Sequence, residues 1–371
     1  MIKLCQDKSC TGCAACYITC PKKAISMKAD KYGFMHPIIN HDICIQCKKC
    51  VNICPVINHV PLNYPLKAFA CYDLDKNSRL ASTSGAFSAV ICKYIIERGG
   101  VVYGCVFKPP FSVKHIRCTN LNEVDNLRGS KYVQSCLEDV LKSILDDLKQ
   151  HRIVLFIGTP CQIAAVKSLS GESGYLITVD IICHGIPSMQ FLKDTIPLKY
   201  QKLSDSKLIF RINTRYHFLI KRGEQAPIFE RPLSNDIYMK GFFNGVTFRN
   251  SCFRCQYAQN KRGSDITCGD FWGLKSSKVE NTEDGVSLVL INTIKGSDIF
   301  EKLKVRMWIE QRPVSEALSG NEQLNKPFRY SIRVRIFRLL YPIIGYRMAL
   351  GISLPDKIIV MKIKHLFNSL S

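Results

Sequence analysis

Hydrophobic side chains change their spacing along the middle of the chain, and this change predicts strands that alternate with helices. Residues 152–158 and 176–183 are apolar at successive positions, as are strands buried on both faces of a parallel sheet. Residues 84–98 and 137–149 instead carry apolar side chains at helical spacing. Further strand patterns cover residues 68–72, 101–107, 286–292 and 305–309, and a further helix pattern covers residues 162–169. The alternation predicts an α/β domain whose sheet is at least partly parallel.

The two ends of the chain differ from this middle part. Cysteines cluster in the first 60 residues, and residues 59–66, with two prolines and little periodicity, are typical of a linker. The last 43 residues carry eight basic side chains and one acidic side chain, about a third of the net charge of +22. We therefore expect three parts, at residues 1–60, 66–328 and 329–371.

A composition of 46% hydrophobic, 10% aromatic and 22% charged residues is that of a globular protein, and it excludes a disordered, collagen-like or coiled-coil chain. No run of about 20 apolar residues exists that would span a membrane. The first residues lack the apolar centre of a signal peptide, so we expect a cytoplasmic protein. Because cytoplasmic thiols stay reduced, the 19 cysteines indicate metal binding or catalysis rather than disulfides.

Two cysteine runs near the N-terminus share one spacing, in which gaps of two, two and three residues are followed by a proline. This is the pattern of bacterial two-cluster ferredoxins, in which the fourth cysteine of each run ligates the other cluster. A pair of zinc sites is the alternative, but zinc normally takes two ligand pairs separated by a wide gap. So small a module has little core, and the metal must supply folding energy. Cluster one would use Cys10, Cys13, Cys16 and Cys54, and cluster two would use Cys44, Cys47, Cys50 and Cys20.

A second group of cysteines lies in the body of the chain. Cys161 and Cys183 each follow a predicted buried strand, at the edge of an open sheet where ligand sites gather. Cys252 and Cys255 form a Cys-x2-Cys pair, which needs two further ligands. Those ligands could come from Cys161, Cys183 or Cys268, which would make a third iron–sulfur cluster or, alternatively, a zinc site. Small buried cysteines and ordinary turns are the structural alternative for each motif.

Two polar segments have the composition of cofactor-binding loops. Residues 82–87 open the first long helix, whose N-terminal N–H groups suit a phosphate, although an ordinary helix cap has the same residues. Residues 129–135 combine a glycine, a cation and an amide, which suit a nucleotide or flavin ring but also occur in plain loops. His184 and Asp270 could move protons near a flavin, although hydrogen-bonded structural roles are commoner for such residues.

Taken together, these motifs resemble the family of coenzyme F420 hydrogenase/dehydrogenase beta subunits over roughly residues 1–320. The ferredoxin runs alone are not specific to that family, whereas the ordered set of body motifs is. These motifs are Thr83-Ser-Gly85, Gly129-Ser-Lys-Tyr-Val-Gln-Ser, Gly158-Thr-Pro-Cys-Gln, Cys183-His-Gly-Ile-Pro-Ser, Cys252-x2-Cys255 and Ser264-Asp-Ile-Thr-x-Gly-Asp270-Phe-Trp-Gly.

The resemblance implies a body domain that binds FAD and one [4Fe–4S] cluster. It assigns Cys161, Cys183, Cys252 and Cys255 to that cluster and ranks Cys268 below them, because that position is often aliphatic in the family. Ala86 departs from a glycine-richer turn, and an alanine there is strained if its φ is positive. The implied flavin contacts are Ser84, Gly85, Ala86, Phe87, Ser130, Lys131, Tyr132, Gln134, Thr159 and Gln162.

The expected fold is a ferredoxin-like two-cluster module of α+β type, followed by a mixed α/β flavin and iron–sulfur domain. The resemblance implies an FAD-dependent oxidoreductase that passes electrons between [4Fe–4S] clusters and a two-electron substrate, with a redox protein or a small molecule as its partner. It does not show that coenzyme F420 is the acceptor, because bacterial relatives with a ferredoxin fusion occur in surface-polysaccharide biosynthesis. The alternatives are a flavin-free electron carrier and an accessory protein of a membrane glycan-synthesis complex.

The basic segment at residues 329–371 alternates arginine and lysine with large apolar residues. Such a segment can lie flat on an anionic membrane, at the inner face for a cytoplasmic protein. Alternatively, it forms a helix that packs on the body and leaves its basic face in solvent. Residues 358–370 have the pattern of a second short amphipathic helix. No nucleic-acid motif accompanies the charge, so we expect no nucleic-acid partner.

Overall fold

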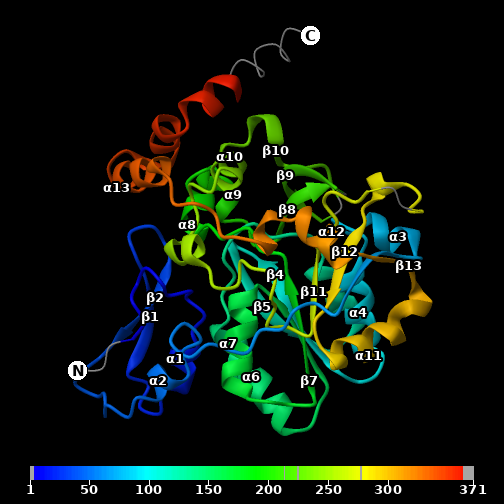
Figure 1. Cartoon of the computed structure of the whole chain (residues 1–371). Coiled ribbons are helices and arrows are strands. Elements are labelled where there is room, and N and C mark those ends of the chain that lie inside the picture. Colours follow the sequence, from blue (N-terminus) through cyan, green and yellow to red (C-terminus); the bar gives the residue numbers. More distant parts are fainter. Residues whose placement is uncertain (1–3, 213, 224, 276–277, 362–371) are drawn as a thin grey trace, which may run out of the picture.

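The computed structural model describes residues 4–212, 214–223, 225–275 and 278–361. A small N-terminal domain lies beside a larger body built on a central sheet (Figure 1). The small domain pairs β1 (Ile25–Ala29) antiparallel to β2 (Met35–Ile39), and it contains two short helices, α1 (Ala15–Thr19) and α2 (Lys49–Asn52). Few of its apolar residues are buried, as the length of the module predicts, and one of them, Phe34, packs on Phe191 of the body.

The body is organised around an eight-stranded mixed sheet in the order β13-β3-β12-β11-β7-β6-β4-β5. Strands β4, β6, β7 and β11 pair in parallel, and the other pairs are antiparallel. This arrangement confirms the predicted mixed α/β domain with a partly parallel sheet. The strands are β3 (Lys67–Asp73), β4 (Val101–Lys108), β5 (Ser112–Cys118), β6 (Val154–Gly158), β7 (Leu176–Ile181), β11 (Ile266–Asp270), β12 (Ser287–Ile291) and β13 (Met307–Arg312).

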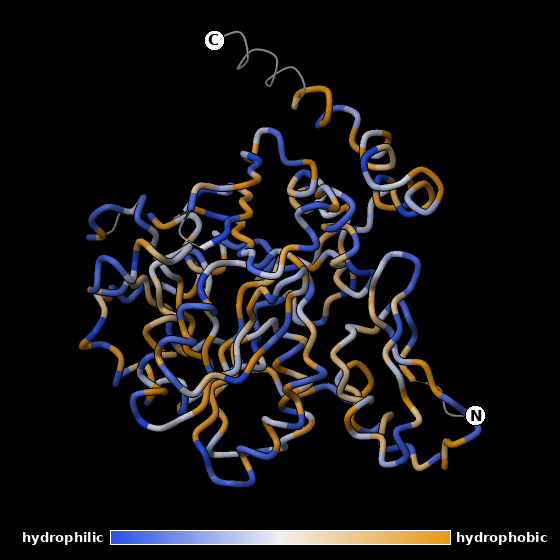
Figure 2. Tube along the Cα trace, turned by 180° about the vertical axis from the view of Figure 1, so that it is seen from behind, coloured by the Kyte–Doolittle hydropathy of each residue, from blue (hydrophilic) through white to orange (hydrophobic). Residues whose placement is uncertain are grey.

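Helices cover both faces of this sheet, and the alternation of the strand side chains explains why. Leu155 packs with α4 (Phe87–Ile96) and α11 (Ile294–Leu303) on one face, whereas Phe156 packs with α6 (Glu138–Lys149) and α7 (Pro160–Ser170) on the other. The central strands are therefore apolar on both sides, and they appear as orange segments inside the body in Figure 2. The remaining short helices are α3 (Lys76–Leu80), α5 (Leu121–Val124), α8 (Met189–Lys193), α9 (Leu198–Gln201), α10 (Ile237–Phe243) and α12 (Val314–Ser319).

A second, three-stranded antiparallel sheet was not predicted from the hydrophobic pattern. It consists of β8 (Ser206–Ile212), β9 (Arg215–Arg222) and β10 (Phe229–Pro232). Lysine and arginine interrupt the apolar residues of β8 and β9, so no clear alternation is present in the sequence. The sheet packs its inner residues against α10 in a core that is rich in aromatic rings.

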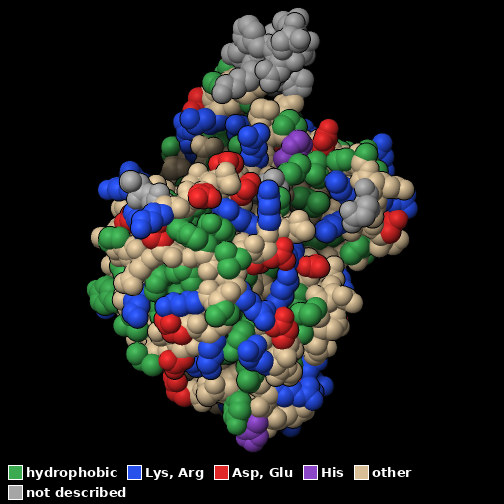
Figure 3. All heavy atoms as spheres, turned by 90° about the vertical axis from the view of Figure 1, so that its right-hand side faces the viewer, with side chains coloured by type: hydrophobic (Ala, Val, Ile, Leu, Met, Phe, Trp, Pro, Cys, Tyr) green, Lys and Arg blue, Asp and Glu red, His purple; other side chains and the backbone are tan. Residues whose placement is uncertain are grey.

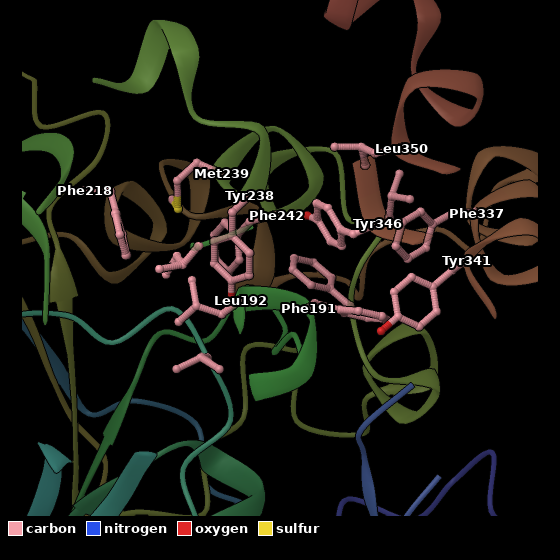
Figure 4. Close-up of a cluster of buried hydrophobic side chains, with 14 of the residues drawn as sticks. Phe191, Leu192, Phe218, Tyr238, Met239, Phe242, Phe337, Tyr341, Tyr346 and Leu350 are labelled. Carbon is pink, nitrogen blue, oxygen red and sulfur yellow. The ribbon is translucent and has the colours of Figure 1, made fainter. Parts of the chain in front are cut away.

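The basic C-terminal segment forms α13 (Ile332–Ser353), which bends at Gly345, where φ is 74°. Its inner side chains, including Phe337 and Tyr346, pack on Phe191 of α8 and enter the aromatic core (Figure 4). On this inner side the segment therefore behaves as a helix packed on the body. Its outer side still exposes apolar residues to solvent, and most of the predicted helix at residues 358–370 lies outside the described part of the chain.

Candidate functional site

The two cysteine runs fold into the same unusual backbone. Gly12 and Gln46, the residues before the second cysteine of each run, have φ of 69° and 53°, and Ala14 and Lys48, the residues after it, have φ of 63° and 58°. Left-handed residues with a Cβ cost roughly 1–2 kcal/mol each, so this curl needs a compensating interaction. The curl recurs in both runs, and ligation of a shared metal cluster would supply that compensation.

The third cysteine of each run lies in a short helix, and these two helices, α1 and α2, pack on each other. This packing places the fourth thiol of each run beside the other run. Cys54 lies close enough to Cys10 to affect its electrostatics, and Cys20 lies beside Cys47 and Cys50. Cys20, Cys44, Cys47 and Cys50 line one small cavity of about 20 Å³. Backbone N–H groups also donate to the sulfurs, from Gly12 to Cys10 at 3.4 Å and from Ala24 to Cys20 at 3.2 Å. The residues present therefore fit two clusters.

Cys5 is an additional thiol beside the first run, and nothing in the local spacing marks it. Its S–H contacts both Cys10 and Cys54, and this contact lowers the pKa of those thiols to about 4 and about 6. Its own pKa is raised by the same two neighbours. An additional thiol, that of Cys5, therefore lies beside the predicted ligands of cluster one.

The four thiols implied by the family resemblance come together where the small domain faces the body. Cys161 begins α7, Cys183 follows β7, and Cys252 and Cys255 lie in and just after a 3₁₀ turn at Asn250–Arg254. Cys161, Cys183 and Cys252 lie close enough to Cys255 for its charge to raise their pKa, and burial raises the pKa of Cys161 and Cys252 to about 12. Thiols buried in this way stay protonated unless a metal replaces the proton, so the group fits a thiolate-bound cluster.

Cys268 lies apart from this group. It belongs to β11, its sulfur is 3.4 Å from the Ser88 hydroxyl, and it packs with Cys71 and Cys92 in the core beneath α4. Among the described residues, no three histidine, cysteine or acidic side chains converge closely enough to hold a single metal ion.

A cavity of about 310 Å³ opens next to the four thiols, a volume typical of small-molecule sites. It lies at the carboxyl ends of β6 and β7, where open α/β sheets bind ligands. Cys13, Cys161 and Cys183 line its wall. Most of the residues expected to contact a flavin line it as well, namely Ser84, Ala86, Phe87, Ser130, Lys131, Tyr132, Gln134, Thr159 and Gln162.

Gly85 is not among the residues that line the cavity, and its expected role as a flavin contact stays a prediction. A Cβ at Gly85 would lie 2.3 Å from the carbonyl oxygen of Cys71 and 2.6 Å from the nitrogen of Ser287. The glycine therefore allows the loop to pack tightly on β3 and β12. The next residue, Ala86, has φ of 68°, so this alanine adopts the strained, left-handed backbone conformation.

The N-terminus of α4 points a positive helix end at the cavity. No side chain caps this end, and Ala86, Phe87 and Ser88 line the cavity there. Uncapped N–H groups at a helix N-terminus attract anions, phosphate in particular. Lys131 adds a positively charged side chain. Its ammonium group donates to the carbonyl oxygens of Leu127 and Arg128 at 2.9 and 2.8 Å. Burial lowers the pKa of Lys131 to about 8.

These features agree with the comparisons with known proteins. Residues 151–317 match the family described as the C terminus of the beta subunit of coenzyme F420 hydrogenase/dehydrogenase, and residues 9–58 match the 4Fe-4S dicluster domain. Residues 151–317 are therefore similar to the C-terminal part of this family of beta subunits, and residues 9–58 are similar to dicluster ferredoxin domains. The chain is an iron–sulfur protein with a ferredoxin-type domain for electron transfer.

Individual relatives are distant. The F-subunit of the F(420)H(2) dehydrogenase of Methanosarcina mazei is 20% identical over 321 residues, which cover 83% of this chain and 86% of that protein. A ferredoxin-like protein in the nif region of Rhizobium leguminosarum bv. trifolii is 38% identical over 55 residues, 13% of this chain and 78% of that protein. A chain in the structure "Xenon derivatization of the F420-reducing [NiFe] hydrogenase complex from Methanosarcina barkeri" is 18% identical, with 73% of this chain and 98% of that chain covered and a TM-score of 0.46.

One buried arginine joins the first cysteine run to the cavity loop. Arg249 donates to the carbonyl oxygens of Cys10 at 2.6 Å and Met35 at 2.8 Å, and to the Gln134 side chain at 3.2 Å. Only 1% of its surface is exposed. Thr11, Gly12 and Cys13 consequently reach the cavity wall. The small domain thus contributes directly to the site.

The far wall of the cavity comes from the second sheet and was not predicted from the sequence. Arg211 of β8 donates to Asp270 at 2.7 Å, and Tyr216 of β9 lines the same wall. Asp270 also affects the electrostatics of His184, whose pKa burial lowers. The structure therefore brings His184 and Asp270, the two candidate proton-handling groups, to one cavity. Arg211 and Tyr216 could not be found from local motifs, because they reach the cavity only through tertiary packing.

His115 forms a fixed polar contact at the back of the cavity. Its Nε2 lies 2.9 Å from the Ile157 carbonyl, and its Nδ1 lies 3.0 Å from the Ser135 hydroxyl, which also accepts from Gln162 at 2.9 Å. Burial lowers the pKa of His115 to about 4, so the ring is neutral at pH 7. With Nε2 donating to the carbonyl, Nδ1 accepts the hydroxyl proton of Ser135.

We expect His115 to make the folded protein more sensitive to acid. The unfolded histidine titrates near pH 6.5 and the folded one near 4, so its contribution to stability is complete above pH 6.5 and is lost progressively down to pH 4. The loss amounts to about 3 kcal/mol. Urea unfolding of the wild type and of His115→Gln between pH 4 and 7 measures it, and the variant should show a flatter profile. Parallel profiles of the two proteins would contradict this role. Acid also releases the iron–sulfur clusters, but it does so in both proteins, so this effect cancels in the difference between their free energies of unfolding.

Proposed function

We propose that this chain is an iron–sulfur flavoprotein oxidoreductase that passes electrons between [4Fe–4S] clusters, FAD and a two-electron substrate. The observation that carries the proposal is that one cavity is lined by Cys13 of the first run and by Cys161 and Cys183 of the body group. A bound flavin would exchange two electrons with a substrate and single electrons with clusters. The assigned ligands are Cys10, Cys13, Cys16 and Cys54; Cys44, Cys47, Cys50 and Cys20; and Cys161, Cys183, Cys252 and Cys255.

The residues of the cavity have distinct roles in this proposal. The α4 N-terminus and Lys131 bind the negative groups of the cofactor, because both present positive charge to the cavity. The neutral His115 holds Ser135 and, through it, Gln162 in one orientation, so the polar wall is preorganised. On the opposite side, Arg211 orients Asp270 toward the space left for a substrate.

Anaerobic reconstitution tests the cofactor content. We expect about twelve iron atoms in three clusters and one FAD per chain, with the flavin released on denaturation. A Ser88→Trp variant, whose indole would fill the cavity at the α4 N-terminus, should lose FAD and keep its iron. Ser297→Trp, on a similar half-buried turn of α11 outside the cavity wall, is the matched control and should keep both. A wild type with full iron that binds no FAD would instead support the flavin-free carrier.

The substrate is open to direct test. The Methanosarcina mazei relative is named as part of an F(420)H(2) dehydrogenase, so reduced coenzyme F420 is the first electron donor to offer. If it bleaches the cluster absorption, this chain shares that substrate. If it does not, an oxidoreductase step or an accessory role in surface-polysaccharide biosynthesis remains our proposal. We also propose that the chain divides at residues 1–60, 66–328 and 329–371, which limited proteolysis in the linker at residues 59–66 would test.

The outer face of α13 is our proposal for a membrane contact on the cytoplasmic side. No helix among the described residues is long and apolar enough to cross a membrane. On α13, however, Leu339, Ile343 and Met348 are 69%, 74% and 62% exposed, and Arg335 and Arg347 lie exposed among them. Apolar side chains flanked by arginine are typical of helices that lie on anionic lipid.

A double variant tests this contact without disturbing the aromatic core. Leu339→Glu/Ile343→Glu should reduce sedimentation with anionic vesicles at least tenfold, because it removes inserted apolar area and adds repulsive charge. Val305→Glu/Ile294→Glu places the same charges on exposed apolar residues of the body and should have little effect. Equal sedimentation of both variants and the wild type would reject the membrane contact.

A further inference from the structure

The four thiols of the second set lie at the outer end of the small domain. Of the eight cysteines in the two runs, all of them described, only Cys47 is exposed. None of Cys20, Cys44, Cys47 and Cys50 lines the large cavity, whereas Cys13 of the first set does. Helix α1 packs on α2 on one side and on α6 and α7 of the body on the other (Figure 1). The first set is therefore the inner one, and the second set is the one nearest to solvent.

The surface around these four thiols is strongly basic. Residues 20–24 and 41–50, which hold the second set, contain four lysines and one acidic residue, Asp42. All four lysines are exposed, and none of them is found in an ion pair. The side of the body that carries β13 and α11 differs, because acidic and basic side chains are interspersed there (Figure 3). We call the exposed residues Lys22, Lys23, Lys48, Lys49, Ile43 and Ile45 the cluster-two patch.

Two features show that the cluster-two patch is more than a solvated face. Ile43 and Ile45, on either side of Cys44, are 48% and 56% exposed, so apolar area lies next to the lysines. Lys23 and Lys48 have φ of 51° and 58°, a conformation that glycine adopts without strain. The φ of Lys48 belongs to the curl of the cysteine run, which Ala14 shares, but both lysines are exposed and follow Cys20 and Cys47 closely in sequence, so they add positive charge to this surface. Apolar centres with a ring of charge are typical of docking surfaces.

We propose that an acidic one-electron carrier protein docks on the cluster-two patch and exchanges electrons there with the outermost cluster. Charge complementarity selects the partner, because four lysines attract an acidic surface and speed its encounter. In each encounter one electron would pass between the carrier and the cluster, so that one partner loses what the other gains, and two encounters match the two electrons of the substrate step. The route of the electrons after docking rests on the proposed function, whereas the docking itself does not.

A charge-reversal variant of the whole protein with its clusters tests the docking. An acidic flavodoxin is the probe, and its dissociation constant for Lys22→Glu/Lys23→Glu/Lys48→Glu/Lys49→Glu should rise at least tenfold at low salt. Wild-type binding should weaken steeply with added salt, whereas the variant should respond little. The matched control is Lys199→Glu/Lys202→Glu/Lys207→Glu/Lys302→Glu, which reverses four exposed lysines of the body and should bind within twofold of the wild type.

A second donor separates docking from damage to the cluster. Methyl viologen radical is a small cation that needs no docking surface, so it should reduce the patch variant as fast as the wild type. Slow reduction by flavodoxin with fast reduction by methyl viologen supports the proposal. Equal flavodoxin binding by the patch variant and the control variant overturns the proposal. The proposal is also overturned if the patch is needed for self-association or for vesicle binding and flavodoxin does not bind. If flavodoxin docks on the patch but no FAD is found, the proposed function fails and the docking stands.

Discussion

We expect the replacement of Cys255 with serine to remove the proposed third iron–sulfur cluster and to leave the two N-terminal clusters in place. Iron per chain should fall from about twelve atoms to about eight, because the body group loses one of four thiolates and a serine hydroxyl is a poorer ligand. Cys255 lies in the buried group with Cys161 and Cys183, whereas the ferredoxin thiols form their own two sets. Iron and sulfide analysis, with electron paramagnetic resonance of the reduced protein, measures the change.

The matched control is Cys268→Ser. Cys268 is also buried, but its neighbours are Ser88, Cys71 and Cys92 rather than the body group. We therefore expect this variant to keep all of its iron. If Cys255→Ser retains twelve iron atoms, or if Cys268→Ser is the variant that loses four, the ligand assignment of the third cluster is wrong.

How much of the site could be predicted depends on whether its residues are close in sequence. The spacing of each ferredoxin run is local, so the wrapped thiol loops follow from the sequence. Cys161 and Cys183 were found because they follow apolar strands, which marks one edge of a parallel sheet. Cys5, His115 and Arg211 have no such signal, because only tertiary packing brings them to the site.

The exact ends of the helices and strands also could not be predicted from the sequence, because they depend on tertiary contacts. The helix predicted at residues 84–98 starts at Phe87, because the loop before it must first pass Gly85 close to β3 and β12. The periodicity of the strand at residues 152–158 is clear, but only Val154–Gly158 pairs with neighbours. In α13, apolar residues occur on both the buried and the exposed face, for example Phe337 and Ile343, so the sequence could not tell which face packs on the body.

The buried ion pair of Asp180 and Arg262 holds the loop that follows Cys255, a proposed ligand of the third cluster, and breaking the pair should be strongly destabilising. Asp180 in β7 is 0% exposed and Arg262 is 2% exposed, and the guanidinium Nη2 donates to Oδ2 at 2.6 Å. The same guanidinium donates to the Tyr257 carbonyl at 3.0 Å and the Thr267 hydroxyl at 3.2 Å. It therefore ties the chain just after Cys255 to two strands of the central sheet.

We expect Asp180→Ala to lower the free energy of unfolding by about 3–5 kcal/mol, because it leaves the guanidinium charge buried without a partner. The loop after Cys255 should then loosen, so the body cluster is lost faster to a chelator than the two N-terminal clusters. Asp180→Ala/Arg262→Met removes both charges and should recover at least half of the lost stability. Urea unfolding of the single and double variants measures this coupling, and additive losses would mean that the pair contributes nothing as a pair.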